Sequence, residues 1–84
     1  MKKPFRCRVE CVDGFGNKSY FDIKDHTVRY YSSAIVPLAI SNIAPDNAAL
    51  LQFALQDAES DREVGAALDK YASFAKTWKI LVTP

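Results

Sequence analysis

The sequence predicts an α+β domain: an antiparallel sheet of three or four strands with two helices packed on one face. Residues 5–24 alternate apolar and polar side chains on both sides of a glycine-containing turn, which is typical of a β-hairpin. Residues 45–78 instead repeat apolar side chains at helical spacing. Strands therefore come first and helices second, an order that favours a two-layer α+β fold.

The first element is a hairpin over residues 5–24. An apolar side chain occupies every second position from Phe5 to Cys11. The turn that follows contains Gly14, Gly16 and Asn17, residues that adopt positive φ at little cost. Alternation then resumes in the second strand. The apolar row expected to face the core consists of Phe5, Cys7, Val9, Cys11, Phe21 and Ile23.

A third strand is expected over residues 27–31, which alternate again after a short turn at Asp25 and His26. It would complete an antiparallel meander. Residues 34–40 allow two further interpretations. They fit an edge strand with a bulge at Pro37, or a short helix capped by Ser33 with Pro37 in its first turn. We favour an extended or irregular segment.

The first helix is predicted over residues 45–58, because Pro45 suits a first helical turn and Asp46 favours the positive end of the helix dipole. Residues 59–61 break the pattern and supply a capping residue. The apolar side chains at helical spacing in this first helix are Leu50, Leu51, Ala54, Leu55 and Ala58.

The second helix is predicted from an apolar stripe that begins at Val64 and runs through Phe74 or Ala75 to Trp78. Residues 78–82 are apolar and rich in β-formers, so they are either a fourth strand or the frayed end of this helix. The helical side chains expected to contact the sheet are Leu51, Leu55, Leu68, Tyr71 and Trp78.

Composition indicates one small globular domain spanning residues 1–84, with 49% hydrophobic and 25% charged residues. No apolar run reaches the roughly 18 residues of a membrane span, and the basic start leads into an alternating strand rather than a signal sequence. We therefore expect a cytoplasmic protein. The net charge is +1, with seven basic against four acidic residues in 1–30 and four against six in 31–84.

Cys7 and Cys11 are expected to be reduced core residues. Residues four apart on a strand lie about 13 Å apart, too far for a disulfide or for two ligands of one zinc ion. His26, the single histidine, falls in an expected solvent-exposed turn beside Asp25 without a nucleophile nearby. The sequence thus indicates no catalytic residue, metal or cofactor, and we expect a protein that is not an enzyme.

The sequence favours two functions, and a third, small-ligand binding or catalysis, stays open because a pocket between sheet and helices cannot be seen from sequence. The first is a non-catalytic protein–protein interaction module: a small accessory or inhibitory protein that binds a partner protein and forms a homodimer. It is favoured because Phe15 at the loop tip and one of two adjacent tyrosines should be exposed. The alternative is single-stranded nucleic-acid binding on a basic outer sheet face, to which Arg29 or Tyr31 contributes depending on register. Glu10 and Asp22 oppose a polyanion there. The interaction candidates are Arg6, Arg8, Phe15, Tyr20, Lys24 and Tyr31.

Overall fold

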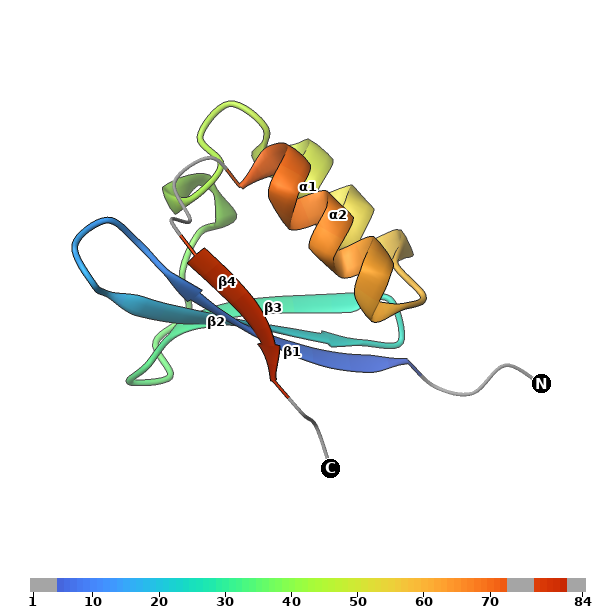
Figure 1. Cartoon of the computed structure of the whole chain (residues 1–84), viewed down its shortest axis with the longest axis horizontal. Coiled ribbons are helices and arrows are strands. Elements are labelled where there is room, and N and C mark those ends of the chain that lie inside the picture. Colours follow the sequence, from blue (N-terminus) through green and yellow to red (C-terminus); the bar gives the residue numbers. More distant parts are fainter. Residues whose placement is uncertain (1–4, 73–76, 82–84) are drawn as a thin grey trace.

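The computed structural model describes residues 5–72 and 77–81, and it confirms the α+β fold. Four antiparallel strands form one sheet in the order β3-β2-β1-β4. Both helices lie on one side of this sheet, as Figure 1 shows, and the other side is uncovered. The elements are β1 (Arg6–Val12), β2 (Lys18–Lys24), β3 (Thr27–Ser32), η1 (Ile40–Asn42), α1 (Ala48–Asp57), α2 (Asp61–Tyr71) and β4 (Thr77–Leu81).

The predicted hairpin is confirmed, with Cys7 opposite Ile23 and Val9 opposite Phe21. Its loop is held by the Asp13 carboxylate, which accepts hydrogen bonds from the backbone N–H of Phe15 at 2.8 Å and of Asn17 at 2.9 Å. Gly16 takes the positive φ of 83° that the loop requires.

Of the two interpretations of residues 78–82, a fourth strand or the frayed end of the second helix, the strand is confirmed by β4. β4 pairs with the free edge of β1 and places Trp78 opposite Cys11. The extension of the second helix to Trp78 was wrong, because α2 ends at Tyr71. Trp78 approaches the helices from the sheet instead, and its indole Nε1 donates a hydrogen bond to Asp69 of α2 at 2.9 Å. Residues 74, 75 and 82 lie outside the described residues.

Residues 33–39 form neither a regular edge strand nor a helix. The chain turns sharply after β3, with the Ile35 N–H donating to the Ser32 carbonyl at 2.9 Å. It then returns alongside β3 through a single bridge between Tyr31 and Pro37. Ile35 adopts a φ of 62° and is 72% exposed. A β-branched residue is strained in this left-handed conformation, where glycine or asparagine is usual.

Each helix follows a polar residue, but only the side chain before α2 caps its helix: the Asn47 side chain before α1 makes no capping hydrogen bond. α1 begins three residues later than predicted, because residues 45–47 form a separate turn closed by the hydrogen bond from the Asn47 N–H to the Ala44 carbonyl at 3.2 Å. α2 begins after Ser60, whose hydroxyl accepts from the Glu63 N–H at 3.2 Å. The Glu63 carboxylate in turn accepts from the Glu59 N–H at 2.8 Å, an arrangement close to a capping box.

The core lies between the sheet and the helices, as expected from the apolar row of the hairpin. Phe21 stacks on Tyr30 with ring centroids 4.4 Å apart, and the buried Tyr30 hydroxyl donates to Ser19 at 2.8 Å. Phe5, Tyr71 and Trp78 are only partly buried around this core. The largest fully buried side chains are Phe21, Ile23, Leu51, Leu55, Leu68, Val9, Val64 and Cys11.

We predict that Gly65→Ala destabilises the protein, although alanine favours helix by about 1 kcal/mol. A Cβ at Gly65 would lie 2.8 Å from Cη2 of Trp78, whose ring is fixed by the hydrogen bond to Asp69. Overpacking of this kind typically costs about 1–3 kcal/mol. Urea unfolding should therefore show a net loss, and in a Trp78→Leu background the same alanine should stabilise. Stabilisation in both backgrounds would contradict the close contact.

We predict that Ile35→Asn stabilises the protein by about 0.5–1 kcal/mol, because asparagine tolerates the left-handed conformation and no packing is lost at this exposed position. The matched control is Val36→Asn, since Val36 is also exposed but has no positive φ. Thermal unfolding should show a gain at position 35 alone. Equal changes at the two positions would rule out backbone strain as the cause.

Candidate functional site

The outer face of the sheet carries a charged row that crosses three strands. Arg8 on β1 lies opposite Asp22 on β2, which lies opposite Arg29 on β3. Arg8 Nε donates to Asp22 Oδ1 at 2.9 Å, and the Tyr31 hydroxyl donates to Asp22 Oδ2 at 3.0 Å. Partial burial alone would raise the Asp22 pKa, but these hydrogen bonds and the positive charges of Arg8 and Arg29 outweigh it and lower the pKa. Asp22 therefore stays ionised and neutralises much of the nearby positive charge.

The next row contains the two tyrosines expected on this face. Tyr20 and Tyr31 stack with ring centroids 5.8 Å apart and ring planes 26° apart. The Tyr20 hydroxyl donates to Glu10 at 3.2 Å, and Lys79 lies 3.9 Å from the same carboxylate. Each ring thus packs against the other and uses its hydroxyl within the sheet. Because Arg29 and Tyr31 are two residues apart, both lie on this face and are not alternatives.

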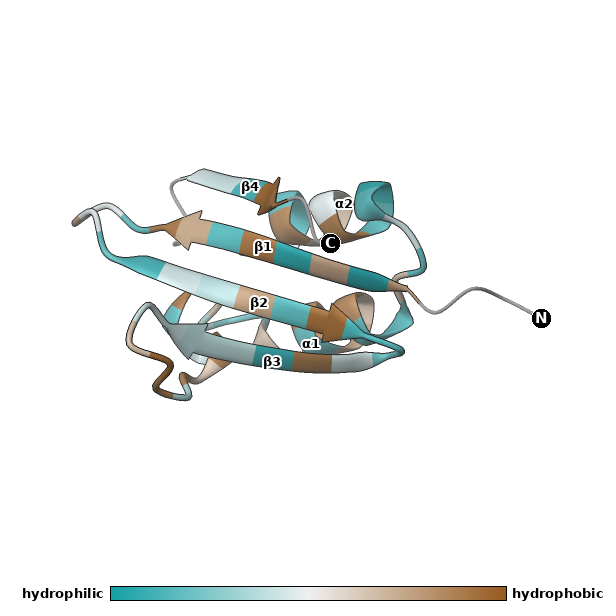
Figure 2. Ribbon diagram, turned by 90° about the horizontal axis from the view of Figure 1, so that it is seen from below, coloured by the Kyte–Doolittle hydropathy of each residue, from teal (hydrophilic) through white to brown (hydrophobic). Residues whose placement is uncertain are grey.

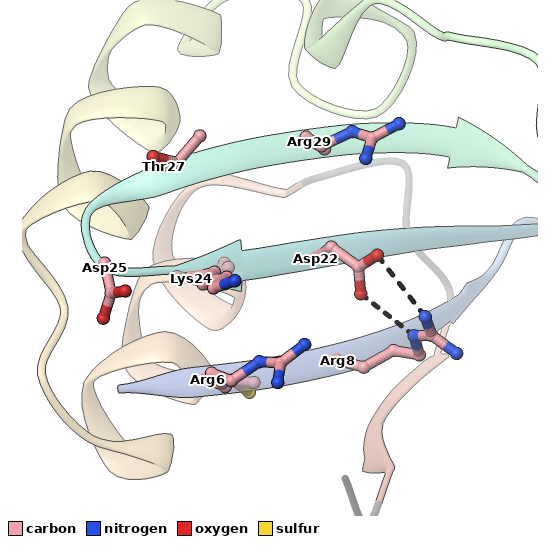
Figure 3. A pocket seen from close by; sticks show the side chains of 9 residues that line it. Arg6, Arg8, Asp22, Lys24, Asp25, Thr27 and Arg29 are labelled. Atoms are coloured by element: carbon pink, nitrogen blue, oxygen red, sulfur yellow. Dashed lines mark hydrogen bonds and ion pairs between the residues drawn. The ribbon is translucent and has the colours of Figure 1, made fainter. Parts of the chain in front are cut away.

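A shallow concavity of about 400 Å³ lies on this face where β1 begins and β2 turns into β3. Figure 3 shows that its basic side chains come from three strands, with Arg6 and Arg8 on β1, Lys24 on β2 and Arg29 on β3. Asp22 and Asp25 are the acidic lining residues, so the lining holds four positive and two negative side chains. The structure therefore brings together three of the predicted candidates, Arg6, Arg8 and Lys24.

A second surface lies on α1, and sequence analysis missed it. Leu51 and Leu55 are fully buried against the sheet, but Leu50 is 52% exposed and Phe53 is 60% exposed. Leu50 shares the helical spacing of the buried leucines in the sequence, but it does not belong to the core. The signal was present in the sequence: an apolar pair three residues apart lies on a different side of this helix from the buried pair. Asp57, the last residue, is the one charged side chain of α1.

Phe15 is exposed as predicted, at 92%, but it is separate from the other candidates. It lies in the loop beyond the Val12–Lys18 pair, whereas Arg6 and Lys24 pair at the opposite end of the same two strands. In Figure 2 this loop and the turn after β3 project from the same end of the sheet. Phe15 and the basic concavity therefore cannot contact the same small ligand.

The two cysteines are free and buried, as the sequence indicated. Burial, together with the nearby Asp61 carboxylate, raises the pKa of Cys7 to about 12. Burial also raises the pKa of Cys11 to about 12, with a smaller contribution from Glu10. Both thiols are thus protonated and poor nucleophiles at neutral pH.

The predicted turn position of His26 is confirmed, and its side chain is exposed. Its ring is nevertheless not free in solvent, because Nδ1 lies 2.5 Å from the carbonyl oxygen of Gln56 in the last turn of α1. Within residues 5–72 and 77–81, no three His, Cys, Asp or Glu side chains are grouped as metal ligands would be. No helix in these residues has the length and apolar character needed to cross a bilayer.

Comparisons with known proteins assign the chain to no group: no family model matches it, and neither does any curated protein or solved structure. The basic concavity on the sheet and the apolar outer face of α1 are therefore the two surfaces from which function is inferred.

We predict that both thiols resist alkylation in the folded protein. With a pKa of about 12, roughly one thiol in 10,000 is ionised at pH 8, about a thousandfold fewer than for an exposed cysteine. Mass spectrometry after iodoacetamide treatment at pH 8 should show almost no adduct without denaturant and two adducts in guanidinium chloride. Rapid labelling of either thiol in the folded state would contradict the burial of Cys7 and Cys11 between the sheet and the helices.

Proposed function

We propose that the protein is a non-catalytic interaction module that associates with other protein chains, including a second copy of itself, through the outer face of α1. The observation that carries this proposal is the exposure of Leu50 and Phe53 on a helix that is apolar on both sides. A helix with apolar residues all round is normally covered on all sides. In this fold the sheet covers only the side that carries Leu51 and Leu55.

The contrast with α2 supports this proposal. Both helices lie in the same layer and pack against each other. Yet the exposed residues of α2 are mostly charged, as expected for a solvent-facing helix. Of the two helices, α1 alone therefore presents an exposed face whose transfer out of water costs little desolvation free energy. The exposed charged residues of α2 are Asp61, Arg62, Glu63, Asp69 and Lys70.

The free energy available from burying Leu50 and Phe53 indicates a weak complex. Full burial of a leucine or phenylalanine side chain contributes about 1.5–3 kcal/mol, and about half of each remains to be buried here. Leu50 and Phe53 from two copies then contribute about 3–6 kcal/mol, near the lower end of the cost of association. The flanking Ala49, Gln52 and Gln56 must add contacts. Because the gain from Leu50 and Phe53 barely offsets the cost of association, these flanking contacts set the affinity, and we expect a transient dimer with a dissociation constant in the millimolar range.

The proposal includes no catalytic residue or cofactor. The thiols are buried with raised pKa values, and His26 is directed at a backbone carbonyl rather than at a nucleophile. Two unpaired cysteines are also consistent with the reducing cytoplasm, where we propose that the protein acts.

We predict that Phe53→Glu abolishes self-association measured by light scattering at about 1 mM protein. A carboxylate at the centre of the apolar face would have to be buried without a partner. Ile35→Asn is the matched control, because it removes an exposed apolar side chain outside α1 and should leave the mass unchanged. A wild type that stays monomeric at this concentration, or a dimer unaffected by Phe53→Glu, would overturn the proposed surface.

A further inference from the structure

We propose that the concavity on the outer sheet face binds a phosphate group. This site is separate from the proposed interaction surface, because α1 packs on the opposite side of the sheet. The binding groups are the side chains of Arg6, Lys24 and Arg29, with Arg8 held beside them by Asp22.

The register of the hairpin brings two basic side chains together on the outer face. Arg6 lies directly opposite Lys24 on the neighbouring strand, and both side chains are exposed on the outer face. Like charges that face each other across a strand pair destabilise a sheet. Within the described part of the chain, no carboxylate forms an ion pair with either of them. An anion between the two side chains would remove this repulsion.

The side chains that line the concavity carry a net positive charge. Asp22 accepts hydrogen bonds from Arg8 and from the Tyr31 hydroxyl, so its charge is largely balanced within the lining. Asp25 lies in the turn between β2 and β3 at a φ of 48°. Four cations against two carboxylates leave an excess of two positive charges, which matches the charge of a phosphate dianion.

The chemistry of the lining side chains also suits phosphate. Guanidinium groups bind phosphate oxygens in bidentate fashion, and Arg6 and Arg29 approach the concavity from opposite sides of Lys24 (Figure 3). The Thr27 side chain adds a hydroxyl at the rim. The volume of about 400 Å³ exceeds that of one phosphate, so the phosphate should be part of a larger ligand.

The same chemistry is offered by a small phosphorylated molecule and by a nucleic-acid backbone. The stacked tyrosines do not favour base recognition, because Tyr20 and Tyr31 pack against each other and their hydroxyls bind Glu10 and Asp22. Phosphate contacts, rather than stacked bases, are therefore the expected mode of binding at this site.

The test is a titration with pyrophosphate at constant ionic strength, followed by ¹⁵N–¹H NMR. We expect saturable shifts confined to the amides of Arg6, Lys24, Thr27 and Arg29, with a dissociation constant in the millimolar range. Lys24→Gln should weaken binding at least fivefold. Lys18→Gln is the matched control, because Lys18 is exposed on the same strand but pairs at its other end, opposite Val12.

Asp22→Asn provides a change in the opposite direction. It removes a negative charge from the lining and releases Arg8, so pyrophosphate should bind severalfold more tightly. The proposal is overturned if the shifts do not saturate, if chloride at equal ionic strength reproduces them, or if Lys18→Gln weakens binding as much as Lys24→Gln.

A second arm distinguishes the source of the phosphate. Oligothymidylates of increasing length are compared with pyrophosphate by fluorescence anisotropy and by competition. Affinity that rises with length and falls steeply with salt indicates a nucleic-acid backbone. Displacement of the oligonucleotide by pyrophosphate, with affinity independent of length, indicates a small phosphorylated ligand. Failure of pyrophosphate to compete would show that the oligonucleotide binds elsewhere and would overturn the assigned site.

Discussion

The pairing of β4 with β1 is the contact on which the rest of the structure depends. It covers the free edge of β1 and turns that strand into an interior strand of the sheet. It also brings Trp78 against α2, where the indole binds Asp69 and its ring lies directly over Gly65. A larger residue than glycine would force the sheet and helix apart at this point. Trp78 thus adds a hydrogen bond and a close packing contact between β4 and α2 to the buried core that joins the two layers.

The fold separates two kinds of surface. Basic side chains gather at one end of the outer face of the sheet, because charged residues alternate with the buried row of β1 and β2. The apolar excess of α1 is left on the opposite side of the molecule. A phosphorylated ligand and a second protein chain would therefore not compete for space. The two proposed binding surfaces therefore differ in chemistry and lie on opposite sides of the sheet (Figure 1).

The hairpin could be predicted in detail because alternation, turn residues and strand length all agree in residues 5–24. Trp78 was ambiguous because it lies four residues after Phe74 and three after Ala75 in the sequence. Both spacings continue the helical period, although Trp78 belongs to a strand. The exposure of Leu50 was missed because neighbouring leucines both fit a helical stripe. The concavity could not be seen without the register that sets Arg6 against Lys24 and Asp22 against Arg29.

The central claim is that the uncovered apolar face of α1 is an interaction surface. Methyl NMR of leucine-labelled protein over a hundredfold dilution tests it directly, because each buried and exposed leucine of this helix reports separately. The account predicts that the Leu50 methyl signals shift with concentration while those of the fully buried Leu68 in α2 do not. Concentration-independent Leu50 signals, or shifts that appear first in the sheet, would contradict it.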